Sequence, residues 1–419
     1  MLWRQVSGLL FLKYKKNLVI AFFLKKKLEK AMANSSLSNA KLTKNDEFYT
    51  QYVDIEKEVN AYLDFNPDVF KDKTILLPCD DPEWSNFTKY FAQNFKRFGL
   101  KKLISTSYAV ESKFYKDYQP SLFETESPLF DKDKTRINGK IFILEADENG
   151  DGKINVDDLK WNYLKGDGDF RSEEVKILRD EADIIITNPP FSLFREFLKW
   201  IVEANKKFLI IGNINALTYK EVFPLIKNNE IWLGSSYFNG GAAYFVGSEK
   251  LYDPKKMSNE KHAYIKYGKL YWRVNGVRWY TNLEHGRRHQ PLVLMTEADN
   301  LKFSKHKEIV SSGYIKYDNY NAIEVPYADA IPSDYKGIMG VPVSFLDKYC
   351  PEQFEILGTS DNGLVSDDVK ITNGLTQEFV DNYYKNGGTG SYKMGNPTAG
   401  LYRNGIAEMI YKRIFIKAK

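Results

Sequence analysis

Short apolar runs alternate with stretches of helical spacing between about residues 46 and 246. Phenylalanine recurs every three to four positions across 87–98, which predicts a helix with one apolar face. This alternation predicts a doubly wound, mostly parallel α/β sheet, and ligands bind such sheets at the carboxyl ends of the strands. The apolar runs that predict buried strands are 74–78, 103–107, 140–145, 183–187 and 207–212.

The pattern changes at about residue 247, where Lys, Arg and Tyr become frequent and apolar runs become short. Residues 250–288 contain ten Lys or Arg against three Asp or Glu. We therefore predict an α/β domain over 44–246 and a second, mixed and β-rich region over 247–419.

Residues 1–43 are predicted to be a non-native or disordered extension. The apolar run 18–24 is too short to span a bilayer, and lysines interrupt the sequence before it. Met32 begins a polar stretch rich in Ser and Asn, which predicts that translation starts there and that 1–31 is upstream sequence. A basic amphipathic arm and a membrane-surface helix are the alternatives.

Composition narrows the class of protein only slightly. Aromatic residues make up 15% of the 419 residues, which suits base stacking but equally suits an aromatic-rich core. The net charge of +5 is mild, so a nucleic-acid footprint would have to be a local patch. Two isolated cysteines, Cys79 and Cys350, exclude a disulfide framework and a zinc cluster and fit a reducing cytoplasm.

The strongest chemical motif is Asn188-Pro189-Pro190-Phe191, which directly follows the predicted strand 183–187. The prolines fix their φ angles and hold the preceding residues extended, so the motif predicts a rigid loop at the carboxyl end of a strand. The Asn188 side-chain oxygen and the Pro189 carbonyl can each accept one hydrogen of a planar amine. Two such acceptors free the nitrogen lone pair for attack on a sulfonium methyl group.

Phe191 can stack on a base that has been flipped out of a duplex. A plain proline turn after a strand is the alternative. Enzymes that methylate glutamine side chains or RNA bases carry the same motif, so it indicates amino-group methylation more firmly than it indicates the substrate.

Two further loops are candidates for binding the cofactor. The aromatic-Thr pair Tyr49 and Thr50 precedes the first helix, as in amino-methyltransferases where it lies under the methionine moiety. Pro78, Asp80 and Asp81 follow the first strand, where an acid can bind the positively charged amino group of the cofactor. A carboxylate that caps the following helix is the alternative role.

The cofactor's adenosine half has weaker candidates. Asp169 is predicted to bind the adenine amino group and Phe170 to stack on the ring, although the segment also reads as a polar glycine turn. After the second strand no acid occurs before Glu111, so the partner of the ribose hydroxyls is not identified.

The stretch 147–158 matches a calcium-binding EF-hand loop at six positions. Position twelve is Asp and not the usual bidentate Glu, so a turn without a cation is the alternative. A bound Ca²⁺ would have a structural role. The predicted oxygen ligands are Asp147, Asn149, Asp151, the Lys153 carbonyl and Asp158.

Taken together, these segments resemble the EcoRI-type adenine-specific DNA methyltransferases, from about residue 44 to the end of the chain. The acidic PCDDPEW turn and an EF-hand-like insertion both recur in that family. The residues that carry the resemblance are FYTQ at 48–51, LPCDDPEWSNFTKYF at 77–91, LKGDGDFRSEE at 164–174, ADIIITNPPFSLFREF at 182–197, KKFLIIGNINALTYKEVFP at 206–224, TNLEHGRRHQPL at 281–292 and GVPVSFLDKYCPEQFEILG at 340–358.

The resemblance implies a bacterial or phage enzyme that methylates the N6 amine of adenine within a short duplex site, with S-adenosylmethionine as cofactor. It implies a role in restriction-modification or anti-restriction, with an endonuclease that cuts the same site as a partner. We expect a monomer that contacts double-stranded DNA and no membrane. RNA or glutamine methylation on the same fold, and a non-catalytic DNA-binding relative, are the alternatives.

By the same resemblance, 247–419 is expected to recognise the DNA target. Four arginines are candidates for phosphate or guanine contacts. Each can equally be an ordinary surface or salt-bridged residue. The four are Arg273, Arg278, Arg287 and Arg288.

Overall fold

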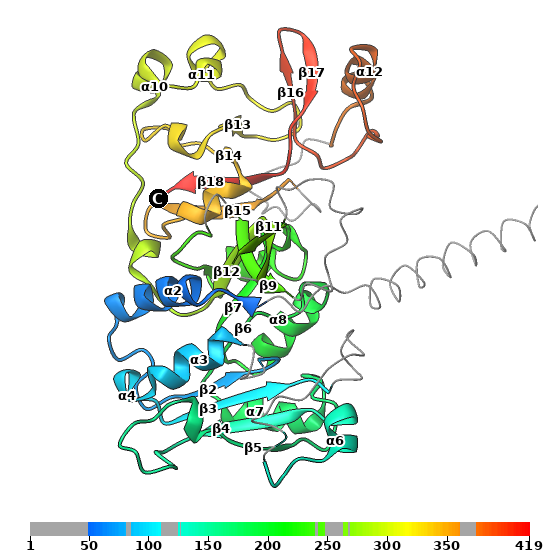
Figure 1. The fold of residues 1–419 in the computed structure, drawn as a ribbon. Helices are drawn as coiled ribbons and strands as arrows, with labels where there is room; N and C mark the ends of the chain where they lie inside the picture. Colours follow the sequence, from blue (N-terminus) through cyan, green and yellow to red (C-terminus); the bar gives the residue numbers. More distant parts are fainter. Residues whose placement is uncertain are drawn as a thin grey trace, which may run out of the picture.

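The computed structural model describes residues 49–80, 85–109, 125, 127–238, 242–247, 263–266, 269–360 and 374–419 (Figure 1). The predicted extension 1–43 and the predicted start at Met32 lie outside these residues.

An eight-stranded sheet forms the centre of the lower part of the molecule in Figure 1. The four central strands run parallel in the order β3-β2-β6-β7, and antiparallel strands flank them on both sides. All five predicted strands are confirmed, but the sheet is mixed and not mostly parallel. In spatial order the strands are β5 (Lys160–Tyr163), β4 (Lys140–Leu144), β3 (Lys102–Ser107), β2 (Thr74–Leu77), β6 (Ile184–Thr187), β7 (Lys207–Asn213), β12 (Val277–Thr281) and β8 (Trp232–Leu233).

Helices pack against both faces of this sheet. Successive side chains of a strand point to opposite faces, and in the central strands the side chains on both faces are apolar. Ile75 and Leu77 face a core shared with the helices before β3, whereas Leu76 faces the core of the helices after β5. Fully burying one such side chain contributes about 1.5–3 kcal/mol. The first face carries α2 (Tyr52–Phe65), α3 (Asn86–Gln93) and α4 (Phe95–Phe98), and the second carries α7 (Glu173–Glu181), α8 (Phe194–Glu203) and α9 (Phe223–Lys227).

The helix predicted over 87–98 is present but broken at Asn94. Asn94 has φ −100° and ψ 10°, and Gly99 ends the second piece in the left-handed conformation at φ 62°. Asparagine side chains compete for backbone hydrogen bonds, and here the Asn94 amide donates to the Tyr90 carbonyl at 2.9 Å. None of the helices in the described ranges combines the length and apolar character needed to cross a membrane.

The predicted domain boundary near 247 does not separate two independent units. Strand β1 (Tyr49–Thr50) pairs with β9 (Ala242–Gly247), which joins β11 (Lys269–Asn275) and β10 (Ala263–Lys266) in a second sheet. The chain then turns at Gly276, whose φ of 69° favours glycine, and β12 returns to pair with β7 in the large sheet. Segments from both sides of residue 247 therefore build both sheets.

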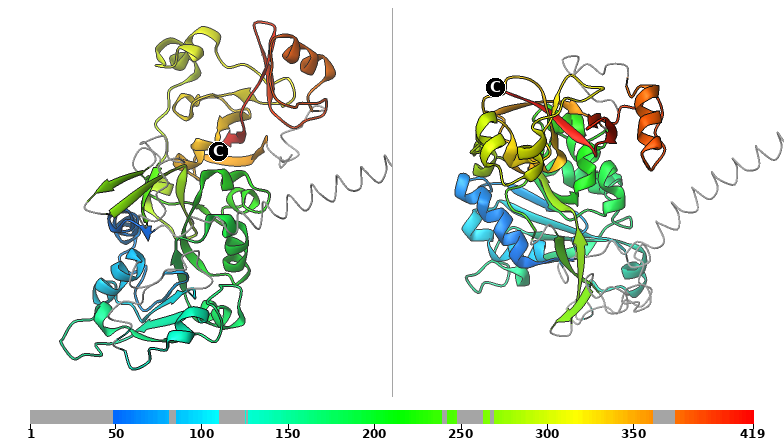
Figure 2. Two further views of the ribbon diagram at one scale, coloured as in Figure 1. Left: turned by 45° about the vertical axis from the view of Figure 1, so that its right-hand side comes forward. Right: turned by 90° about the horizontal axis from the view of Figure 1, so that it is seen from above.

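The C-terminal part forms the upper half of the molecule (Figure 2). Its mixed sheet has the order β13-β14-β18-β15, with a separate hairpin of β16 and β17 beside α12. Buried side chains of this sheet, such as Val341 and Ile356, share one core with α8 and α9. The elements are α10 (Glu297–Phe303), α11 (Lys307–Ser312), β13 (Ile323–Glu324), β14 (Met339–Pro342), β15 (Phe354–Thr359), α12 (Gln377–Lys385), β16 (Gly400–Arg403), β17 (Ile406–Met409) and β18 (Arg413–Ala418).

Short elements complete the described chain. They are α6 (Lys132–Ile137) and the 3-10 helices η2 (Val156–Asp158), η3 (Phe191–Leu193), η4 (Ile214–Thr218), η7 (Gly286–His289), η8 (Ala328–Ala330) and η9 (Val343–Lys348).

A buried carboxylate fixes α2 to the segment that follows β8. The Glu58 side chain accepts hydrogen bonds from the backbone N–H groups of Ser235 at 2.8 Å and Ser236 at 2.6 Å, and from the Tyr62 hydroxyl at 2.8 Å. Burial raises the pKa of Glu58, and these donors oppose that rise. The interaction joins Glu58 and Ser236, which are 178 positions apart in the chain.

We expect Glu58→Ala to lower the free energy of unfolding by about 2–4 kcal/mol, because it leaves two part-buried N–H donors without an acceptor. Urea unfolding measures the loss. The control is Glu56→Ala on the exposed side of the same helix, which should stay within about 0.5 kcal/mol of the wild type. Equal losses in the two variants would contradict this role.

Candidate active site

The tetrapeptide 188–191 leaves the carboxyl end of β6, a central parallel strand. Pro189 is buried, Asn188 and Phe191 are half-buried, and the Leu193 N–H closes the turn onto the Pro190 carbonyl at 2.8 Å. Phe191 begins η3 and packs against the core under α2 and α3. The strand-to-loop geometry predicted for the motif is therefore present.

The turn after β2 lies beside this loop. The Thr187 hydroxyl, one residue before Asn188, is 2.7 Å from the Pro78 carbonyl and 2.5 Å from Asp80 Oδ2. The Ser85 hydroxyl donates to Asp80 Oδ1 at 2.7 Å and also accepts from the first turn of α3. Asp80 is 6% exposed, so its carboxylate is held by hydroxyl groups inside the protein.

Hydrogen bonds continue from this turn to the predicted aromatic-Thr segment. The Asn86 amide, next to Ser85, donates to the Thr50 carbonyl at 2.7 Å. The structure thus brings Thr50, Pro78 and Asp80 together with the catalytic loop, as expected for one site. The side chain of Tyr49 and all of Asp81 lie outside the residues that the structure describes.

Two buried threonine hydroxyls near the turn have no hydrogen-bond partner within the described part of the chain. They are Thr50 Oγ1, and Oγ1 of Thr106 in β3, whose carbonyl accepts the Asp80 N–H at 2.8 Å. Buried polar groups are normally satisfied, so these two hydroxyls fit a site that a polar cofactor completes. Sequence reasoning passed over Thr106, Ser85 and Thr187, although Thr187 directly precedes the motif.

The glycine loop before α7 approaches the end of β3 closely. Gly168 has φ 87°, and a Cβ there would lie 2.4 Å from the Ser107 carbonyl oxygen, so a larger residue cannot fit. The Ala109 N–H donates to the Asp167 carbonyl at 2.8 Å. This contact joins the glycine loop to the residues that follow β3.

The position of Phe170 corrects its predicted role. Its side chain is fully buried, with ring centroids 5.0 Å from Phe197 and 5.6 Å from Trp200 on α8. A ring packed in the core in this way has no face for adenine, so we assign Phe170 to packing. Sequence spacing alone does not distinguish a buried phenylalanine from a stacking one.

Asp169 is exposed enough to bind a ligand but is already paired. Arg171 donates to both of its carboxylate oxygens, at 2.9 and 2.5 Å, and also reaches Glu196 at 3.1 Å. Burial raises the pKa of Asp169, but the Arg171 hydrogen bonds outweigh burial and lower it overall. Tyr108, directly after β3, lies beside Cys79 and Asp169, and burial raises the pKa of its hydroxyl.

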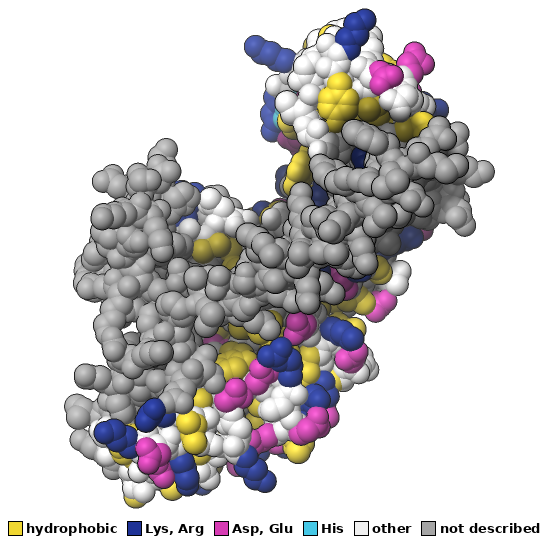
Figure 3. Space-filling view, turned by 90° about the vertical axis from the view of Figure 1, so that its right-hand side faces the viewer, with side chains coloured by type: hydrophobic (Ala, Val, Ile, Leu, Met, Phe, Trp, Pro, Cys, Tyr) yellow, Lys and Arg dark blue, Asp and Glu magenta, His cyan; other side chains and the backbone are white. Residues whose placement is uncertain are grey.

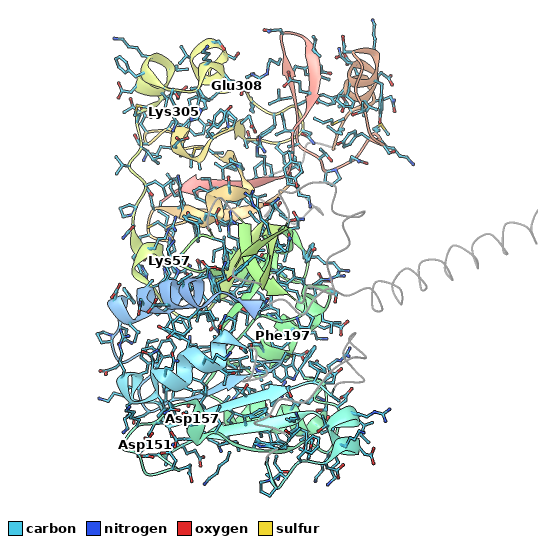
Figure 4. All side chains as sticks on the ribbon, in the orientation of Figure 1. Lys57, Asp151, Asp157, Phe197, Lys305 and Glu308 are labelled. Carbon is cyan, nitrogen blue, oxygen red and sulfur yellow. The ribbon has the colours of Figure 1, made fainter. Side chains whose placement is uncertain are left out.

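The EF-hand-like loop is closed by its own backbone. Figure 4 labels two of its residues, Asp151 and Asp157, at the end of the molecule far from the C-terminal part. The predicted side-chain ligands accept backbone N–H groups: Asp147 from Gly150 and Gly152, Asn149 from Asp151, Asp151 from Lys153, and Asp158 from Glu148, Asn149 and Asn155, all at 2.7–3.1 Å.

The predicted Ca²⁺ site is not supported. Among the described residues, no three His, Cys, Asp or Glu side chains are grouped to bind a metal ion. The sequence match is accounted for by Asp and Asn side chains that stabilise tight turns through their own backbone.

Three of the four predicted DNA-contacting arginines are engaged inside the protein. Arg278 forms a two-point ion pair with Asp347 at 2.7 and 3.1 Å, and their side chains are 12% and 7% exposed. Arg287 donates to the Ser235 carbonyl at 2.7 Å and lies over the Tyr237 ring. These contacts correct the prediction, because a guanidinium with internal partners must break them to reach DNA.

Arg288 is similarly buried, 3.9 Å from the Trp232 ring centroid and 3.1 Å from the Asn229 side-chain oxygen. Arg273 is half-buried in β11 opposite Tyr244, and its role in DNA contact stays a prediction. Figure 3 shows described Lys and Arg side chains interspersed with Asp and Glu over the lower part of the molecule. The positive charge is therefore not gathered on that described surface.

A Pro-Pro loop at the end of a central parallel strand, next to a buried acidic turn, is the arrangement that the sequence predicts for a methyltransferase of planar amino groups. A family model described as "Adenine-specific methyltransferase EcoRI" matches residues 36–419. The chain therefore belongs to the EcoRI family of adenine-specific methyltransferases.

Named relatives agree with the family. The chain is 42% identical over 325 residues to the Type II methyltransferase M.EcoRI of Escherichia coli, covering 77% of this chain and 89% of that protein. It is 35% identical over 337 residues to M.MpnI of Mycoplasma pneumoniae (80% and 89%) and 34% identical over 341 residues to M.MgeORF184P of Mycoplasma genitalium (81% and 91%). No solved structure matches the chain.

We expect Asp158→Ala to lower the melting temperature at neutral pH, because Asp158 accepts three backbone N–H groups. Hydrogen bonds from Asn155, Asn149 and Glu148 lower the pKa of Asp158. Its stabilisation is therefore present above about pH 3.9 and is lost as the pH falls through the lowered folded-state pKa. The melting temperatures of the wild type and the variant should therefore become equal at acidic pH.

The control is Asp157→Ala, which removes an exposed carboxylate from the same loop and should leave the curves unchanged. Millimolar Ca²⁺ should not shift the wild-type melting temperature. A rise in the melting temperature with Ca²⁺ would show that the loop binds the ion and would contradict this prediction.

We expect Arg278→Ala to lower the free energy of unfolding by about 3–5 kcal/mol, because Asp347 is left buried without its partner. At temperatures where the variant stays folded, the salt dependence of DNA binding should not change. If Arg278 contacted a phosphate, its loss would instead reduce the slope of log binding constant against log salt concentration by about 1. Arg195→Ala, an exposed arginine 3.9 Å from Glu221, is the control and should cost under about 1 kcal/mol.

Proposed function

We propose that this protein transfers a methyl group from S-adenosylmethionine to the exocyclic N6 amine of an adenine flipped out of duplex DNA. The observation that carries the proposal is the Asn188–Phe191 loop at the end of β6, hydrogen-bonded through Thr187 to the acidic turn at Asp80. Family membership over residues 36–419 supports adenine as the target base.

The adenine amine is a poor nucleophile because its lone pair is delocalised into the ring. The Asn188 side-chain oxygen and the Pro189 carbonyl accept its two hydrogens and draw the nitrogen toward tetrahedral geometry. The double proline holds both acceptors in place before the reaction, so the loop need not reorganise in the transition state. Phe191 stacks on the flipped base and keeps the amine between the acceptors.

The cofactor, when bound, supplies an electrophilic methyl group on a sulfonium. Within the protein, we assign the Asp80 carboxylate to the ammonium group, which it would bind while it accepts from Ser85 and Thr187. The Thr50 and Thr106 hydroxyls would gain partners when the cofactor binds. Asp169 remains the candidate for the adenine amino group, provided that it shares its oxygens with Arg171. Phe170 is omitted from the site because it is buried.

The relatives that are named Type II methyltransferases suggest the biological role. We infer that the protein acts in the cytoplasm as a monomer within a restriction-modification or anti-restriction system. A restriction endonuclease that cuts the same site is the inferred partner. Recognition of the duplex is assigned to 247–419, and Arg273 on β11 is proposed to contact the DNA there.

Transfer of labelled methyl groups to duplex DNA, RNA or protein separates the proposal from its alternatives. Duplex DNA should be labelled, and hydrolysis of the product should yield N6-methyladenine. Label in RNA or in glutamine would indicate another substrate on the same fold, and no label in any acceptor would indicate a non-catalytic relative.

We expect Asn188→Ala to lower the rate of methyl transfer by about 10²–10³-fold, because one acceptor of the amine hydrogens is lost. Binding of duplex DNA, measured by fluorescence anisotropy, should remain within a few fold. Asn188→Asp is the matched control, since it keeps an acceptor oxygen at the same place and should retain part of the activity. Unchanged turnover in Asn188→Ala would refute the mechanism.

A further inference from the structure

Thr187 occupies the junction between the last residue of β6 and the catalytic loop. Its side chain is fully buried, and its hydroxyl lies within hydrogen-bond distance of two acceptors, the Pro78 carbonyl at 2.7 Å and Asp80 Oδ2 at 2.5 Å. A hydroxyl has one hydrogen to donate, so the two contacts share it. Both acceptors belong to the turn after β2, and the catalytic loop is thus attached to that turn at two points.

The Thr187 side chain connects β6 to the turn after β2, beyond the end of their backbone pairing. The parallel ladder between β2 and β6 pairs Ile75 with Ile184 and Leu76 with Ile185. Continuing this register places Thr187 opposite Pro78, which has no N–H to donate to the ladder. At this position the Thr187 hydroxyl donates to the Pro78 carbonyl and so joins the two chain segments.

The turn held in this way has an unfavourable backbone. Cys79, between Pro78 and Asp80, has φ 70°, which is uncommon for a residue other than glycine. Such a conformation persists only when its surroundings fix it. The Asp80 N–H donates to Thr106, its carbonyl accepts from Thr88 at 3.3 Å, and its carboxylate accepts from Thr187 and Ser85.

We propose that Thr187 is a positioning residue that sets the distance and direction between the amine acceptors and the cofactor turn. It contacts neither reactant; it acts through Asp80 on one side and Asn188 on the other. This assignment rests on the proposed methyl transfer, because it explains how two loops that hold different reactants stay in register. A displacement of about 1 Å at such a site can cost about 10²-fold in rate.

The test replaces Thr187 by valine, which has nearly the same shape and lacks the hydroxyl. We expect the single-turnover rate, with DNA and cofactor both saturating, to fall by about 10–100-fold. Dissociation constants for DNA and cofactor should stay within about threefold, since neither binding group is removed. Thr187→Ser restores the hydroxyl and should restore the rate, and Thr187→Cys, with a weaker donor, should be intermediate.

Thr281→Val is the matched control. Thr281 ends β12 in the same sheet, is equally buried, and donates to the Phe208 carbonyl at 2.7 Å away from the catalytic loop. It should lower the melting temperature about as much as Thr187→Val without slowing methyl transfer. The proposal would be overturned if Thr187→Val and Thr187→Cys both methylate DNA within about twofold of the wild-type rate. Two variants are used so that the test stands even if one of them folds poorly.

Hydrogen exchange separates this inference from the proposed function. Cofactor binding should slow amide exchange in the segment 184–192 of the wild type and Thr187→Ser, and not of Thr187→Val. If the wild type methylates no DNA, the proposed function fails, whereas the attachment of the two loops is still judged by exchange. Equal protection in Thr187→Val and the wild type would refute the attachment.

Discussion

Parallel pairing of β2 with both β3 and β6 is the constraint on which the site depends. Because parallel strands end at the same edge of a sheet, it brings three loops together from positions about 80, 108 and 188 along the chain. Hydrogen bonds from side chains then fix these loops to one another. Ser85, Thr187 and the Thr106 carbonyl all contact the single residue Asp80, so the acidic turn and the catalytic loop form one unit.

Much of the catalytic half was predictable, because its strands are long enough to be recognised and are bounded by turns. The sequence does not reveal strand direction, and the outer strands therefore emerged antiparallel where a parallel sheet was predicted. The break at Asn94 and the return of β12 into the large sheet depend on packing between distant segments. Periodicity is a local property and carries no information about such partners.

The candidate site shows the same division. Asn188 and Asp80 were predicted because the proposed chemistry requires particular residue types at strand ends, and the structure brings their two loops together. Phe170 and Arg278 were misassigned because an aromatic ring or a guanidinium serves packing and ion pairing as well as it serves a ligand. Thr187 and Ser85 escaped notice because hydroxyl residues are common, and only their distances to Asp80 distinguish them.

The return of β12 has a consequence for how the molecule is assembled. On a growing chain, β7 is complete at residue 213, yet its outer edge has no partner until residues 277–281 have been made. An unpaired strand edge is a template for association with other chains. The catalytic half is therefore sealed by a strand that belongs, in sequence, to the other half, and a fragment ending near residue 246 would leave that edge open.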